Sequence, residues 1–244
     1  MVSLLDKNED TKPFSVDRGR LCQIPTPKPT LTWCPLPHSR LMDAVEGQLR
    51  KRGYRVHNST CLLTHGGDRF FGTVSISNRE NLGYRRMIGA RNSHDKSLAA
   101  GLVAGARVTV CSNGWFFGDE VALSRKHTSR LFEDLDERIE AGFSRIFEAW
   151  QQNDLRVVHY REKELSDADA HDLVIRSVDA EALAPSAIPR VLQEYRSPWH
   201  QEFMPRNAWS LFNAHTEILK SRPHLLADRT RALHRVFDEA LEII

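Results

Sequence analysis

The hydrophobic period of this chain changes near residue 130, and that change constrains the fold more than any other feature. Before it, short runs rich in β-branched and aromatic residues are separated by Gly, Asn and Asp, which is typical of antiparallel strands. After it, apolar residues recur every three or four positions, as on one face of an α-helix. Strands followed by helices predict an α+β protein, with an antiparallel sheet in the N-terminal half packed by helices from the C-terminal half.

Five strand-like runs precede the change in period. They lie at residues 54–64, 69–77, 83–90, 97–104 and 107–111. The segments between them are rich in turn-forming residues, so residues 92–95 and 105–106 are both predicted to separate strands. In the last run, Val108 and Val110 are predicted to face one side of a strand, because successive side chains point to opposite faces.

Helical periodicity predicts the remaining elements. An amphipathic helix is expected at residues 38–52, where Leu41, Val45 and Leu49 recur every four positions. A long helix is expected from about residue 131, with an apolar stripe formed by Leu131, Leu135, Ile139, Phe143, Ile146 and Trp150. Further helices are expected at residues 166–180, 188–195, 207–220 and 225–244.

Proline marks a separate N-terminal segment. Residues 1–37 contain proline-rich stretches and are expected to form an extended lead-in without a core of its own. Residues 38–244 are expected to form a single α+β domain, with strands mainly in 38–127 and helices mainly in 128–244.

Composition favours a cytoplasmic protein. The 244 residues are 41% hydrophobic, enough for a sizeable core, and no run of about 18 apolar residues predicts a membrane span. The first residues carry Asp6, Glu9 and Asp10, where a secretory signal would have a positive start and an apolar stretch. The four cysteines lack the spacing of a zinc site, so reduced thiols, no metal and no other cofactor are expected.

Charge is distributed unevenly along the chain. Residues 1–130 contain 20 Lys and Arg against 11 Asp and Glu, whereas residues 131–184 contain 6 against 14. A basic first half favours a polyanionic partner such as nucleic acid, although a solvated surface without a partner would have the same composition.

Aromatic residues interleaved with basic ones point to single-stranded DNA in particular. Positive grooves lined with rings that stack on bases are typical of proteins that bind single strands. The predicted phosphate contacts are Arg85, Arg86, Arg91, Lys96, Arg125 and Lys126, and the predicted stacking rings are Tyr84 and Trp115.

Polar motifs at the ends of the predicted strands have two interpretations. Asn92, His94 and Asp95 can form a turn, or His94 can act as an acid, a base or a phosphate ligand oriented by Asp95. Cys111 and Asn113 can likewise end a strand in a tight turn, or Cys111 can be a nucleophile activated by His94 or His127.

Two later motifs also have more than one interpretation. Residues 125–128, which include His127, can begin the long helix, bind a phosphate there, or do both. In residues 206–217, Asn213 and Glu217 lie four positions apart on a predicted helix. They can satisfy loop backbone groups, or Glu217 can be a base or a metal ligand.

These motifs also carry a resemblance. Residues 91–97, 107–114, 125–128 and 206–217, in that order, resemble the phage- and plasmid-like family called domain of unknown function 932. The likeness covers roughly residues 54–220. It implies a protein of a mobile genetic element, often concerned with replication, recombination or host defence, but no agreed activity and no functional residues.

Three classes of function follow from these observations. The first is a protein that binds single-stranded DNA in replication, recombination or annealing. The second is an enzyme, such as a metal-assisted phosphodiesterase that uses His94 and His127, and the residues do not decide whether catalysis occurs. The third is a non-catalytic module that binds a protein through its acidic helices. Assembly into a homo-oligomer stays open.

Overall fold

The computed structural model describes residues 12–77, 82–110, 113–124, 133–221 and 223–243. The chain divides into two compact units. Unit 1 comprises residues 1–80, 86–104 and 119–146, and unit 2 comprises residues 81–85, 105–118 and 147–244. Three strands and one long helix have residues in both units. The division into a lead-in at residues 1–37 and a single domain at residues 38–244 stays a prediction.

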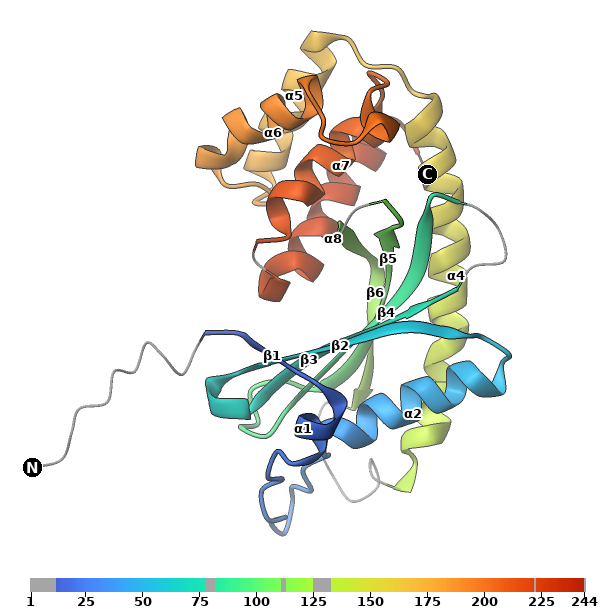
Figure 1. The fold of residues 1–244 in the computed structure, drawn as a ribbon, viewed down its shortest axis with the longest axis vertical. Helices are drawn as coiled ribbons and strands as arrows, with labels where there is room; N and C mark the ends of the chain where they lie inside the picture. The colour runs from blue at the N-terminus through green and yellow to red at the C-terminus, as the bar shows by residue number, and fades with distance from the viewer. Residues whose placement is uncertain (1–11, 78–81, 111–112, 125–132, 222, 244) are drawn as a thin grey trace, which may run out of the picture. The chain divides into compact units, whose positions relative to one another are not determined.

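The strands form one antiparallel sheet in which each strand pairs with its neighbours in sequence (Figure 1). They are β1 (Phe14–Val16), β2 (Val56–Thr64), β3 (Arg69–Ile76), β4 (Tyr84–Ser93), β5 (Ala100–Val108) and β6 (Gly114–Ser124). The described helices are α1 (Arg18–Cys22), α2 (His38–Lys51), α4 (Leu135–Glu162), α5 (Asp167–Asp179), α6 (Ile188–Arg196), α7 (Ala208–Leu219) and α8 (Pro223–Ala240). Strands therefore dominate the N-terminal half and helices the C-terminal half, which confirms the predicted α+β class.

In unit 1, α2 lies across one face of the sheet (Figure 1). Its Leu41, Met42, Val45 and Leu49 are completely buried, as the four-residue spacing predicted. A Cβ atom added to Gly72 of β3 would lie 2.6 Å from the Met42 sulfur, so the close approach of helix and strand requires glycine there.

The predicted helices of the second half are present, and their ends follow known capping rules. Ser166 and Asp169 form a capping box at the start of α5, and the Asn207 side chain accepts a hydrogen bond from the Ser210 amide at the start of α7. Of the predicted stripe on α4, the described members Leu135, Ile139, Phe143, Ile146 and Trp150 are all buried. Within the described chain, no helix combines the length and apolarity needed to cross a bilayer.

Several predicted turns and strands are wrong. β4 continues through Asn92 and Ser93, so the turn begins after them. β5 runs unbroken through Gly105, where a Cβ atom would lie 2.8 Å from the Trp115 carbonyl oxygen, so this glycine serves a close approach and not a turn. β5 ends at Val108, which leaves Val110 51% exposed outside the sheet.

Two strands were missed. One is β1, which pairs with β2 although it lies in the segment expected to be an extended lead-in. The other, β6, begins at Gly114 and includes Trp115, Phe116 and Phe117, all of which are buried. The sequence prediction has Trp115 stacking on a base, although aromatic residues also favour strands.

Candidate functional sites

Unit 1 has two different sheet faces because successive strand residues alternate in direction. One face is packed against α2 and includes Phe70, Val74 and Ile88, which are at most 1% exposed. The other, which we call the outer sheet face, is half-buried. It consists of Thr60, Leu62 and Thr64 of β2, Arg69, Phe71 and Thr73 of β3, and Arg91 of β4.

The strand register brings the basic and aromatic members of the outer sheet face together. Phe71 is paired with Arg91 across β3 and β4, and with Leu62 across β2 and β3. Thr60 and Thr73 are also paired, with 2.6 Å between their hydroxyl oxygens. The face therefore combines two guanidinium groups, one phenyl ring and several hydroxyls.

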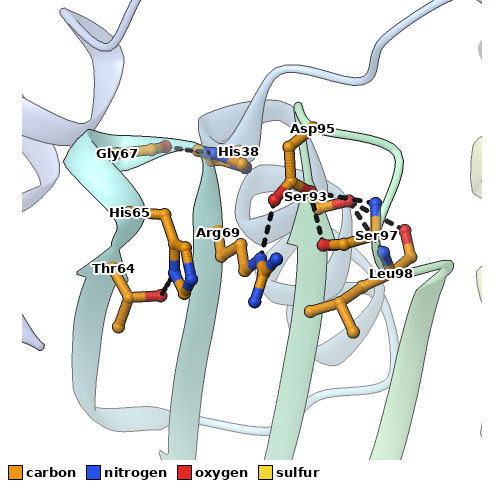
Figure 2. A network of polar contacts seen from close by, with 9 residues as sticks. All are labelled: His38, Thr64, His65, Gly67, Arg69, Ser93, Asp95, Ser97 and Leu98. Atoms are coloured by element: carbon orange, nitrogen blue, oxygen red, sulfur yellow. Dashed lines mark hydrogen bonds and ion pairs between the residues drawn. The ribbon is translucent and has the colours of Figure 1, made fainter. Parts of the chain in front are cut away.

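An ion pair lies at the end of the outer sheet face (Figure 2). Arg69 Nε donates to Asp95 Oδ2 at 2.7 Å, and Asp95 Oδ1 accepts hydrogen bonds from the Ser97 amide and hydroxyl. On the neighbouring strand, the His65 ring hydrogen-bonds the Thr64 hydroxyl at 3.0 Å. Although partial burial raises the pKa of Asp95, the bonds from Ser97 and Arg69 outweigh it and lower the pKa to about 2. Asp95 is therefore an ionised partner of Arg69.

Lys96 follows this ion pair in the turn between β4 and β5. Its backbone has φ +64°, a left-handed conformation that is uncommon outside glycine, and its side chain is exposed. The ammonium group lies 4.8 Å from the centre of the Trp33 ring, a cation–π contact with the N-terminal segment.

Behind the sheet, His38, Asn92 and His94 form a buried cluster. The two imidazole rings stack with centroids 3.8 Å apart, and Asn92 Nδ2 donates to the Leu36 carbonyl at 2.7 Å. His94 Nε2 also bonds that carbonyl at 3.0 Å, and because a carbonyl only accepts, Nε2 must carry the proton. Desolvation lowers the pKa of His94 despite the opposing hydrogen bond to Leu36.

In this cluster Asn92 and His94 both bind the Leu36 carbonyl, which is a structural role. They hold Leu36, in the N-terminal segment, against the end of β4, and both are at most 5% exposed. Asn92 lies in β4 and not in the predicted turn, whereas His94 begins the bend that follows the strand. His94 Nε2 is directed to the Leu36 carbonyl. His94 as an accessible acid, base or phosphate ligand is therefore not supported by this conformation.

Unit 2 encloses the two predicted stacking rings. Tyr84 is 2% exposed and Trp115 is completely buried. The Tyr84 hydroxyl donates to Asp154, and Trp115 Nε1 donates to Asn153 Oδ1 at 3.1 Å. The two rings meet edge to face with centroids 5.4 Å apart, so their faces belong to the core and are not presented to a base.

Two of the sequence motifs do meet in unit 2. Asn113, which precedes β6, places its Nδ2 3.4 Å from the carbonyl oxygen of Asn213 in α7. Both asparagines are at most 2% exposed. Glu217, one helical turn later, is partly exposed and forms an ion pair with Lys220. On α7, Asn213 is therefore buried whereas Glu217 reaches the surface, so the two side chains do not form one site.

A partly buried polar network in unit 2 was missed from the sequence. Arg156 Nε bonds both carboxylate oxygens of Asp238 at 2.9 Å, and the Tyr160 hydroxyl donates to Asp238 at 2.7 Å. The Tyr160 oxygen must then accept from Nδ1 of His234 at 3.2 Å. Burial, and then the positive Arg156, lower the pKa of His234. All four residues lie on α4 or α8, and none of them belongs to a motif of the sequence.

The remaining predicted residues divide into two groups. Arg125, Lys126, His127 and Cys111 lie outside the described residues. Arg85 and Arg86 are partly buried neighbours in β4, and because adjacent strand residues point to opposite faces, they cannot both contribute to one continuous surface. Within the described ranges, no group of three or more His, Cys, Asp or Glu residues could hold a metal ion.

The fold and these sites define the class of the protein: an α+β protein with a half-buried, partly basic sheet face in unit 1 and a second unit whose aromatic and amide motif residues are buried. The sequence pattern of the family described as "Domain of unknown function (DUF932)" matches residues 32–237, and the chain belongs to that family. The match begins earlier and ends later than the motifs suggested, since it includes α2 and most of α8. No curated protein and no solved structure matches the chain.

Proposed function

We propose that the protein binds single-stranded nucleic acid, in particular single-stranded DNA, on the outer sheet face of unit 1. The observation that carries the proposal is the register that sets Phe71 directly opposite Arg91 on a face that also bears Arg69. Phe71 takes the stacking role that the buried Tyr84 and Trp115 cannot fill.

The chemistry of this face suits a flexible polyanion. Guanidinium groups bind phosphates through several donors, and each base stacked on a ring contributes roughly 1–3 kcal/mol. The threonines beside them offer hydroxyl groups to phosphates and sugars. Three cations, Arg69, Arg91 and Lys96, lie on the face or at its end together with the carboxylate of Asp95.

A role in the replication, recombination or annealing of a mobile element is part of this proposal. It is supported by the resemblance to phage and plasmid proteins and by the basic first half of the chain. A cytoplasmic location belongs to the same proposal, because that is where such DNA is handled.

The test measures the binding of a fluorescein-labelled oligothymidine by anisotropy at several salt concentrations. Arg91→Ala should weaken binding and reduce the slope of log affinity against log salt by about 0.7, as expected for one lost phosphate contact on a single strand. Phe71→Ala should weaken binding by roughly 1–3 kcal/mol with little change in that slope.

Arg176→Ala is the matched control. Arg176 is an exposed arginine of α5 in unit 2, paired with Asp172, and its loss removes the same charge from another surface. Absence of binding at low salt, or equal losses in Arg91→Ala and Arg176→Ala, would contradict the proposal. Circular dichroism of each variant excludes unfolding as the cause of a loss.

A further inference from the structure

The interior of unit 2 contains polar atoms that no protein group satisfies. Asn153 Nδ2, Trp209 Nε1, Ser210 Oγ and Asn213 Oδ1 have no hydrogen-bond partner, and their residues are 0–3% exposed. Leaving such a group unsatisfied costs a large part of a hydrogen bond, and native proteins contain few of them. A set of four therefore indicates a missing partner.

The residues that carry the four groups are linked by contacts within unit 2. On α7, Trp209 and Ser210 are separated from Asn213 by four and three residues, so Asn213 lies between them on the helix surface. The Trp209 ring meets the Trp115 ring edge to face at 5.4 Å, and Trp115 Nε1 is bonded to Asn153 Oδ1. Asn153 on α4 is thus connected to α7 through Trp115.

The orientation of both amides follows from their bonded atoms. Asn153 Oδ1 accepts from an indole that only donates, which leaves Nδ2 as the free atom. Asn213 Nδ2 donates to the Trp209 carbonyl at 2.8 Å, which leaves Oδ1 as the free atom. The site therefore presents two donors, from Asn153 and Trp209, one acceptor, from Asn213, and the Ser210 hydroxyl, which can do either.

We infer that Asn153, Trp209, Ser210 and Asn213 bind an internal water molecule. A water accepts two hydrogen bonds and donates two, which matches the free donors and acceptors of this set, and buried waters typically make about three such bonds. None of the four side chains is charged, so the site suits a neutral molecule. The surrounding rings of Tyr84, Trp115, Trp209 and Phe212 contact one another, which favours the smallest neutral molecule of this chemistry.

This site explains why polar residues of the 206–217 motif are buried. The water links α7 to α4 beside the contact between Asn113 and Asn213. Ser210 and Asn213 then position helices through a shared solvent molecule. The inference is independent of nucleic-acid binding, which is placed in unit 1.

The first test is a high-resolution crystal structure of the full-length protein. We expect one solvent peak about 3 Å from at least three of the four atoms. Three results would each overturn the inference: no density there, direct hydrogen bonds among the four groups, or density for an organic molecule. Native mass spectrometry identifies the last case by an added mass.

The second test counts long-lived internal waters in solution by oxygen-17 magnetic relaxation dispersion. Ser210→Ala should reduce the signal by up to one water or shorten its residence time. Ser177→Ala is the matched control, because Ser177 is also completely buried but donates to the Leu173 carbonyl at 2.7 Å. An identical signal in wild type and Ser210→Ala, with both folded, would contradict the inference.

Discussion

The two units place their aromatic and polar side chains differently. Unit 1 places Arg, Thr and Phe on a half-buried sheet face, whereas unit 2 encloses Tyr84, Trp115 and its asparagines in the interior. An aromatic or amide side chain can bind a ligand only if it is accessible, so unit 1 provides the better candidate interface. The difference shows that burial, and not residue type, separates a site from a core.

The largest expected effect concerns the aromatic interior of unit 2. Trp209→Ala should lower the free energy of unfolding by about 3–5 kcal/mol, because it removes a ring packed against Trp115 and Phe212. Trp199→Ala is the control, since Trp199 is 87% exposed and should change stability by less than about 0.5 kcal/mol. Urea unfolding measures both, and equal losses would contradict the contrast between core and surface.

Acid should destabilise the protein through buried neutral histidines in both units. Desolvation lowers the pKa of His94 in unit 1, and it lowers the pKa of His215 in unit 2 to about 4 from 6.5. Between the unfolded pKa of 6.5 and the folded pKa of about 4, the unfolded state binds more protons than the folded state. The contribution of His215 to the free energy of unfolding is therefore fully present above pH 6.5 and is lost as the pH falls towards 4. For His215 alone the loss is on the order of 3 kcal/mol.

Unfolding curves recorded between pH 8 and pH 4 check this expectation. His215→Leu should flatten the slope by removing one buried titrating group. A separate, lower window belongs to Asp95, whose contribution is lost as the pH falls from 3.8 to about 2. Stability that is constant between pH 7 and pH 5 would contradict the burial of neutral imidazoles.

A glycine pair tests the packed side of the sheet in unit 1. Gly72→Ala should destabilise by roughly 1–3 kcal/mol, because the new methyl group would meet Met42 and Phe70. Gly47→Ala on α2 should instead stabilise by up to about 1 kcal/mol, because no atom lies within 4 Å of the new Cβ and alanine favours a helix. Thermal unfolding distinguishes the two, and a stabilising Gly72→Ala would show that α2 lies farther from β3.

The smallest expected effect concerns the charge at the end of the outer sheet face. Asp95→Asn should strengthen oligonucleotide binding a few-fold at low salt, because it releases Arg69 from its ion pair. Asp172→Asn, which releases Arg176 in unit 2, should leave binding unchanged. Anisotropy titrations measure both, and stronger binding in both variants would indicate an effect of net charge without a local site.

The periodic parts of the chain were predicted well from sequence. The α2 stripe, the long α4 stripe and the capped helices α5 and α7 are all present, because helical spacing and caps are local properties. The predictions that turned out wrong share one cause. Gly105 and Asn92 are typical turn residues, yet here a neighbouring backbone and a distant carbonyl determine their place in strands.

Nothing in the sequence separates Phe70, which packs on α2, from its half-exposed neighbour Phe71, since the two differ only in the side of the strand on which they lie. Which side faces α2 is decided by strand register, a long-range property. The same holds for the meeting of Asn113 with Asn213, which are 100 positions apart.

By itself, the sequence determined the α+β class, most helix positions and the family, because these depend on local periodicity and residue order. Only the tertiary structure decided which aromatic and polar side chains are accessible. Accessibility depends on what packs against each side chain, and those partners come from segments far apart in the chain.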